Sequence, residues 1–144
     1  MFNIIKVQAD ILKGLVKQSK GFRFMWGEIN SEEIAVTTDG FVVFVIPKKL
    51  WFINPVGYKP SETMKNLFDD ARQTEVAYRT EIRENNEGCI VKYKNDKTHA
   101  WFSEKLLKQF GKDCEVFIIS PIKPAFILND DKVIGMLCPA RVKE

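Results

Sequence analysis

The chain has 144 residues, of which 45% are hydrophobic and 28% charged, and its net charge is +3 at neutral pH. This size and apolar content predict one folded domain with its own core and exclude an intrinsically disordered protein. No apolar run reaches the roughly 18 residues that a membrane-spanning helix needs, and the amino terminus lacks the long apolar segment of a signal peptide. We therefore expect a cytoplasmic protein with no membrane partner.

The first third of the chain predicts a strand, a helix and three more strands. Apolar residues alternate over residues 2–7, which predicts a short strand, and Lys20-Gly21 is expected to end the helix that follows over 8–19. The apolar stripe of this helix is expected to face inward and consists of Val7, Ile11, Leu12, Leu15 and Val16. The three strands are expected at residues 22–28, 33–38 and 41–47, and the last two flank the hairpin turn Thr38-Asp39-Gly40.

The middle of the chain predicts a connector, a second helix and a second hairpin. Residues 48–60 contain prolines and glycine, and Ser61 can cap a helix from 62 to about 72. The apolar stripe of that helix is Met64, Leu67, Phe68 and Ala71. Residues 75–84 and 88–94 are then expected to pair as a hairpin around a polar turn.

The last third predicts one strand, one helix and three strands. A short strand is expected over 98–102, and Ser103 is expected to cap a helix over 104–110 that Gly111 ends. The final strands are expected at residues 114–120, 124–129 and 132–138. The fold class is therefore α+β, rich in antiparallel strands.

Two segments of the chain share one pattern of strand, polar turn, apolar strand and proline. Residues 34–47 align without a gap to residues 126–139, and the residues around Lys17 align to those around Lys108 at nearly the same offset. This predicts a single domain over 1–144 that contains a duplicated strand-helix-three-strand unit, with both helices on one face of antiparallel sheets. The repeat halves would be 2–47 and 98–142, joined by the connecting segment 48–97. The alternative is coincidence between two generic hairpins.

Lysines recur on both predicted repeat helices, opposite the apolar stripes. They are Lys6, Lys13, Lys17 and Lys20 in the first half and Lys105, Lys108 and Lys112 in the second. Clustered lysines favour contact with the DNA phosphate backbone without base reading. The alternative is that surface helices carry lysine simply for solubility.

The order of elements resembles a domain of the sliding clamps of replicative DNA polymerases. The closest match is the C-terminal third, where the helix from Leu106 to Phe110, the strand from Cys114 to Ile119 and the ending Leu137-Cys138-Pro139-Ala140-Arg141-Val142 are similar to the end of the bacterial clamp. A bacterial clamp subunit carries three such domains, and this chain has room for one. The segment from about 48 to 92 does not align.

The resemblance implies a partner, a second binding site and an assembly. Clamp helices face duplex DNA, so the seven lysines would contact it weakly through the backbone. Bacterial clamps bind partner peptides in a groove that uses their C-terminal strand, which matches Met136, Leu137, Cys138 and Pro139. The alternative is that these four residues close the core. A single domain would need a neighbour to form a ring, and the apolar strand 41–47 is a candidate edge that needs cover, so we expect homo-oligomers.

Few residues suggest catalysis. The lone His99 stands beside Trp101 without a placed nucleophile, and we interpret it as structural. Cys89, Cys114 and Cys138 lack metal or redox spacing and are expected to be reduced and mostly buried. The acidic pairs, which are poor evidence for a divalent ion, are Glu32-Glu33, Asp69-Asp70 and Asp130-Asp131. We expect no catalytic site, no metal and no cofactor.

The sequence therefore supports two functional hypotheses from different classes, with an enzyme on an unrecognised α+β fold as a third. The first is a non-enzymatic, clamp-like DNA-associated protein that contacts duplex without sequence preference, for example a replication accessory of a phage or mobile element. The second is a protein-interaction or assembly module that has the same fold and does not bind DNA. Salt-dependent binding to duplex of any sequence would separate the first from the second.

Overall fold

The fold is mixed α+β, as the sequence predicts. The computed structural model describes residues 3–54, 56–71, 78–80, 82–86 and 89–141. It divides into two compact units. We call residues 3–72 the N-terminal unit and residues 73–144 the C-terminal unit, and describe each by itself.

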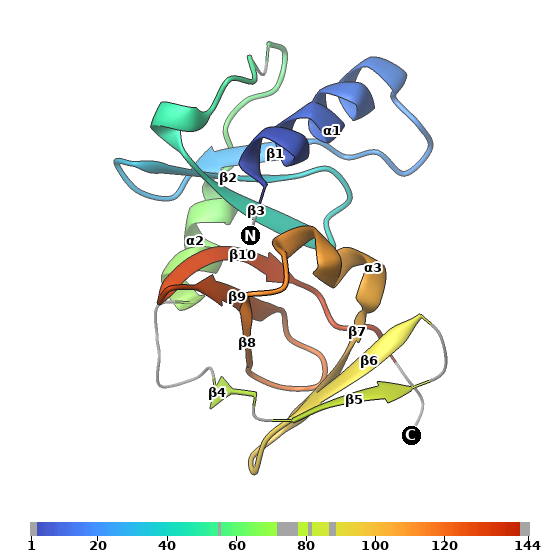
Figure 1. Cartoon of the computed structure of the whole chain (residues 1–144). Helices are drawn as coiled ribbons and strands as arrows, with labels where there is room; N and C mark the ends of the chain where they lie inside the picture. Colours follow the sequence, from blue (N-terminus) through green and yellow to red (C-terminus); the bar gives the residue numbers. More distant parts are fainter. Residues whose placement is uncertain (1–2, 55, 72–77, 81, 87–88, 142–144) are drawn as a thin grey trace. The chain divides into compact units, whose positions relative to one another are not determined.

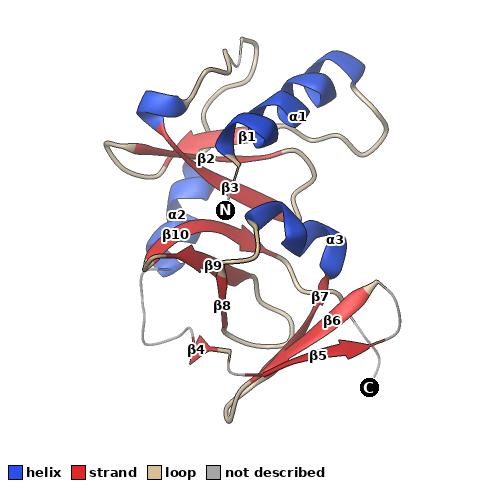
Figure 2. Ribbon diagram, viewed as in Figure 1, coloured by secondary structure: helices blue, strands red, loops and turns tan. Residues whose placement is uncertain are grey.

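The N-terminal unit combines two helices with an antiparallel three-stranded sheet in the order β1-β2-β3 (Figures 1 and 2). Its elements are α1 (Ile4–Lys17), β1 (Met25–Glu28), β2 (Glu33–Thr37), β3 (Val42–Pro47), the 3-10 turn η1 (Lys48–Leu50) and α2 (Glu62–Ala71). In Figure 1, α1 lies in front of β1 and β2, and α2 is drawn fainter behind them. The core of this unit includes Val36 and Ile46 of the sheet, Ile11 of α1, and Met64 and Phe68 of α2.

The C-terminal unit contains two antiparallel sheets and one short helix. Its elements are β4 (Tyr78–Arg79), β5 (Ile82–Asn86), β6 (Ile90–Lys94), β7 (His99–Ser103), α3 (Glu104–Leu107), the 3-10 turn η2 (Lys108–Phe110), β8 (Glu115–Ile118), β9 (Ala125–Asn129) and β10 (Lys132–Leu137). One sheet has the order β10-β9-β8-β4 and the other β5-β6-β7. Phe102, Phe110, Ile118 and Ile127 are fully buried in this unit.

The predicted strand over residues 2–7 is wrong, because α1 begins at Ile4. Asn3 is the N-cap, and its side-chain oxygen accepts the backbone N–H of Lys6 at 3.0 Å. The helix also ends earlier than expected. Gln18 adopts a left-handed conformation and donates its N–H to the carbonyl of Gly14, so Gln18 and not Gly21 ends the helix. Ile4 and Ile5 therefore belong to the first helical turn, and Phe2 lies outside the described residues.

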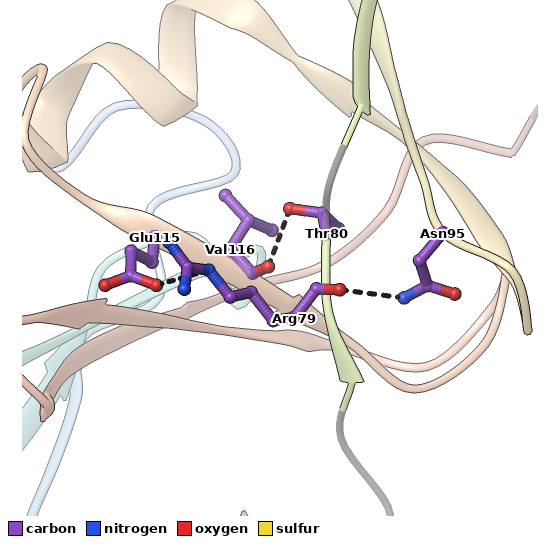
Figure 3. Close-up of polar contacts among 5 residues, drawn as sticks. All are labelled: Arg79, Thr80, Asn95, Glu115 and Val116. Atoms are coloured by element: carbon purple, nitrogen blue, oxygen red, sulfur yellow. Dashed lines mark hydrogen bonds and ion pairs between the residues drawn. The ribbon is translucent and has the colours of Figure 1, made fainter.

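The predicted single strand over 75–84 is also wrong within the described residues, since it consists of two strands with different partners. β4 pairs with β8, whereas β5 pairs with β6. Figure 3 shows the polar contacts that hold β4. The Thr80 hydroxyl donates to the carbonyl of Val116 at 2.8 Å, Arg79 forms an ion pair with Glu115, and the Asn95 amide donates to the carbonyl of Arg79. Residues 75–77 lie outside the described residues.

The gap-free alignment of the two hairpins does not match their turns. Residues 38–41 separate β2 from β3, whereas only Asp130 and Asp131, both with positive φ, separate β9 from β10. In the first hairpin Val36 lies opposite Phe44, and in the second the aligned Leu128 lies opposite Val133. A bulge between Val133 and Gly135 shifts the register of the second hairpin further. Both units contain a helix followed by three antiparallel strands, and duplication beyond that order stays a prediction.

Candidate functional site

The lysines predicted from the first half of the chain lie on the surface. Lys6, Lys13 and Lys17 are exposed on one side of α1, and Lys20 is exposed in the turn that follows the helix. Among the described residues none of these three α1 lysines forms an ion pair, and Asp10 is the one acidic residue of the helix. The N-terminal unit therefore presents a stripe of three lysines on α1 that only Asp10 interrupts.

The lysines of the second half lie on a shorter structure. Lys105 belongs to α3, Lys108 to η2 and Lys112 to the turn after Gly111, and all three are exposed. Leu107 and Phe110 of this segment are buried and Leu106 is half-buried. The predicted design, with lysines outward and apolar side chains inward, therefore describes this segment.

The same design is wrong for α1. Its buried face consists of Val7, Gln8 and Ile11, while two residues of the predicted inward stripe, Leu12 and Val16, face solvent. Val16 is 87% exposed and Leu12 is 38% exposed, and Ile5 on the same side is 72% exposed. A helix that carries apolar residues on two faces can bury one of them in its own unit, and the other then meets solvent.

The exposed apolar residues of α1 form a regular seam. Ile5, Leu12 and Val16 are exposed, and with the half-buried Ala9 they follow one another at intervals of four, three and four residues, which places them in one row along the helix. Lys6 and Lys13 each follow a seam residue directly and border the row on one side, and Asp10 lies one helical turn from each of them. The seam is therefore an apolar strip with a positive edge.

A buried amide fixes the other edge of the seam to the connector after β3. Gln8 is fully buried; its Nε2 donates to the carbonyl of Leu50 at 2.9 Å, and its Oε1 accepts the N–H of Phe52 at 2.9 Å. The amide thus pairs with this short extended segment as a neighbouring strand would. Because Gln8 lies one helical turn from both Ile5 and Leu12, residues 50–52 border the seam.

Aromatic contacts hold this connector in place along its length. Trp51 stacks on Trp26 of β1 at a centroid distance of 6.4 Å, and the Trp26 indole donates to the carbonyl of Tyr58 at 3.0 Å. The Tyr58 ring contacts Phe24 edge-on, and its hydroxyl oxygen accepts a hydrogen bond from Gln18 at the end of α1. The connector therefore contacts α1 through Gln8 and through Gln18, and it contacts β1 through Trp26.

The connector adds exposed apolar side chains to those of α1. Leu50 is 48% exposed and Phe52 is 51% exposed. They flank Trp51, whose ring stacks on Trp26. We define the α1 patch by these apolar residues, which are Ile5, Ala9, Leu12, Val16, Leu50 and Phe52.

The sequence does not predict the α1 patch, because the alternation over residues 2–7 favours a strand at Ile5 and the helical spacing assigns Leu12 and Val16 to the core. The intervals between Ile5, Ala9, Leu12 and Val16 were a usable signal. The N-cap at Asn3 would have revealed it, because a helix from residue 4 has two apolar stripes. The role of Gln8 has no signal in the sequence, since its partners lie more than 40 residues away.

The residues expected to bind a partner peptide lie at the end of β10. Met136 and Leu137 are buried, and Cys138 and Pro139 are half-buried. This burial favours the alternative that these residues close the core of the C-terminal unit. The expected edge strand is likewise buried over residues 42–46.

The side chains that could act as nucleophiles, acids, bases or metal ligands do not form a cluster among the described residues. The cysteines form no disulfide; Cys89 is exposed, contrary to the expectation of burial, and Cys114 and Cys138 are half-buried. Burial raises the pKa of the Cys114 thiol and also that of the Tyr93 hydroxyl. His99 lies in β7 opposite Lys94 and is half-buried. The described residues contain no cluster of three or more His, Cys, Asp or Glu side chains suited to a metal ion.

Two of the acidic pairs, Glu32-Glu33 and Asp130-Asp131, lie at turns in the described part of the chain. The side-chain amide of Asn30 donates its N–H to the Glu33 carboxylate, and the Oδ1 atom of Asn30 accepts the backbone N–H of Glu32. Asp130 and Asp131 form the two-residue turn between β9 and β10. The side chains of Asp69 and Asp70 lie outside the described residues.

Comparisons with protein-family models, with curated proteins and with solved structures find no match for this chain. Among the helices that the structure describes, none is both long and apolar enough to cross a membrane.

Proposed function

We propose that this protein is a non-catalytic binding module that docks a partner protein on the α1 patch. The single observation that carries the proposal is the row of exposed apolar side chains on α1, continued by Leu50 and Phe52 on a connector that hydrogen bonds and ring contacts hold in place. Contiguous exposed apolar surface rimmed by polar residues is typical of protein–protein contact sites. A rigid surface also loses little conformational entropy when a partner binds.

Affinity capture with matched variants tests this proposal. We expect the wild-type chain, immobilised and exposed to an extract of the cells that produce it, to retain a protein that Val16→Asp does not retain. Val16 is 87% exposed, so the change introduces charge on the patch without disturbing the core. The matched control is Ile122→Asp, since Ile122 is 66% exposed in the C-terminal unit.

A retained protein must then bind the purified wild-type chain directly and bind Val16→Asp at least about tenfold more weakly, because the new carboxylate would be buried against the partner without a counter-charge. Equal retention by all three chains would contradict docking on the α1 patch.

A second candidate function is contact with duplex DNA, as in the clamp-like hypothesis. The observation that favours it is the exposure of Lys6, Lys13 and Lys17 in one stripe without ion-pair partners among the described residues. Each phosphate contact should add roughly 0.9 to the slope of log affinity against log salt. Contact of this kind would be weak, independent of sequence and strongest at low salt.

Fluorescence anisotropy with a labelled duplex tests the second candidate. Replacing Lys13, Lys17, Lys105 and Lys108 with Glu should abolish binding without unfolding the protein, because all four side chains are exposed. Two paired variants, Lys13→Glu/Lys17→Glu and Lys105→Glu/Lys108→Glu, assign the contact to one unit. Val16→Asp should reduce DNA binding much less than either paired change. The absence of duplex binding at low salt would leave partner docking as the function.

A further inference from the structure

We propose that the partner docked on the α1 patch is an acidic amphipathic helix, which packs along the seam with its carboxylates over Lys6 and Lys13 and its apolar face against Leu50 and Phe52. The inference rests on the proposed docking function and names the chemistry of the partner. Three properties of the patch support it: the spacing of its apolar residues, the difference between its two edges, and the charge of one edge.

The spacing fits a helix. Intervals of four, three and four residues from Ile5 to Val16 are those of a coiled-coil seam, in which side chains of one helix fit between those of another. Ala9 near the middle is small enough to let a second helix approach closely. The seam extends over about 17 Å, or three helical turns. A partner helix of three turns or more can therefore cover it.

The two edges differ and would orient the partner. On one side of the seam the border is Lys6 and Lys13, which are exposed. On the other side the border is the connector, where Gln8 fixes the backbone of residues 50–52 and the side chains of Leu50 and Phe52 stay exposed. A helix lying on the seam thus meets positive charge along one flank and apolar surface along the other.

The positive charge of the flank formed by Lys6 and Lys13 favours a partner helix that carries acidic residues. Lys6, Lys13 and Lys17 have no ion-pair partner among the described residues, and Asp10 is the only carboxylate on α1. A second copy of this chain packed antiparallel on the seam would bring Lys6 and Lys13 of one helix against the same lysines of the other, which opposes self-association in that orientation. A helix with Glu or Asp beside its apolar stripe matches the charge.

Designed peptides test the inference on the full chain. The probe is a 21-residue helix with Leu at the two core positions of each heptad and Glu at the positions beside them, and its matched control carries Lys instead of Glu. We expect the Glu peptide to bind about tenfold more tightly than the Lys peptide at low salt, and the difference to shrink as salt rises. Lys6→Glu/Lys13→Glu should reverse the preference, and Val16→Asp should weaken both peptides.

Several results would overturn the inference. Equal binding of the Glu and Lys peptides, no binding of either, or a preference that Lys6→Glu/Lys13→Glu leaves unchanged would each do so. Binding to phosphatidylglycerol-containing vesicles that Val16→Asp abolishes, without peptide binding, would assign the patch to a membrane surface. Sedimentation showing a dimer that Val16→Asp dissociates would assign it to a second copy.

The failure of this inference can be told apart from failure of docking itself. If affinity capture still depends on Val16 while the peptides show no charge preference, the docking function stands and the acidic helix does not. If capture does not depend on Val16 and the peptides do not bind, both proposals fail together.

Discussion

The helical segments α1 and α3–η2 have similar sequences and different surfaces. Both carry lysines beside apolar residues, and the sequence pattern assigns them the same role. In α3–η2 each apolar residue is buried or half-buried, and Phe110 is completely inside. In α1 the buried face is narrow and includes the polar Gln8, while Ile5, Leu12 and Val16 are left on the outside.

This difference shows that two lysine-bearing helical segments of similar composition present different surfaces when different residues are buried. In the seven-residue segment α3–η2 the apolar side chains pack against the C-terminal unit, and the exposed side chains include Lys105 and Lys108. The longer α1 attaches partly through the hydrogen bonds of Gln8, and Ile5, Leu12 and Val16 stay exposed. The two attachments can be broken separately.

The largest expected effect is the loss of the α3–η2 attachment in Phe110→Ala. Truncation of a fully buried Phe removes its apolar contacts and leaves a cavity, which costs about 3–5 kcal/mol of unfolding free energy. Urea denaturation followed by circular dichroism measures the change. A loss below about 1 kcal/mol would mean that this segment is not anchored through its aromatic residue.

The attachment of α1 is broken by Gln8→Leu, with a smaller expected cost. The substitution keeps an apolar body but leaves the Leu50 carbonyl and the Phe52 N–H without their partner, which costs about 2 kcal/mol. The matched control is Gln109→Leu, because Gln109 is exposed at the aligned segment of the C-terminal unit and its replacement should change stability by less than about 0.5 kcal/mol. Equal effects of the two changes would show that Gln8 does not anchor the helix.

These contrasts also show which parts of the fold the sequence predicts well. Elements bounded by local signals are close to their expected limits. Ser103 caps α3 through its hydroxyl oxygen, Gly111 follows η2 with positive φ, and α2 begins at the residue after Ser61. Each signal acts within a few residues, so a single sequence contains all the information it needs.

The errors come from interactions between distant residues. The residue that orients α1 bonds to positions 50 and 52, and β4 leaves its expected partner to pair with β8 almost 40 residues later. The hairpins β2–β3 and β9–β10 align in sequence without a gap, yet the turn of the first has four residues and the turn of the second has two. The candidate site depends on both kinds of signal. The lysines and the apolar row on α1 have local signals, whereas the contribution of Leu50 and Phe52 depends on the distant contacts of Gln8.

The N-caps offer a local comparison of the two helices, with effects near 1 kcal/mol. The Asn3 side chain accepts the Lys6 N–H at 3.0 Å, and the Ser103 hydroxyl oxygen accepts the Leu106 N–H at 3.4 Å. We expect Asn3→Ala and Ser103→Ala each to lower the unfolding free energy by about 0.5–2 kcal/mol. Chemical denaturation measures both, and Ser19→Ala, at an exposed position outside a helix, is the control.

The smallest expected effect concerns the seam itself, where a substitution should leave stability almost unchanged. Val16→Gln replaces a side chain that is 87% exposed, so little apolar contact is lost and the change in unfolding free energy should stay within about 0.5 kcal/mol. Val7→Gln makes the same replacement on the buried face of α1, where a polar group without a partner costs at least about 1–3 kcal/mol. Paired thermal and urea denaturation of the two variants measures the difference. If Val16→Gln destabilised the chain as much as Val7→Gln, then Val16 would be part of the core, and the apolar surface that supports partner docking would lose its most exposed residue.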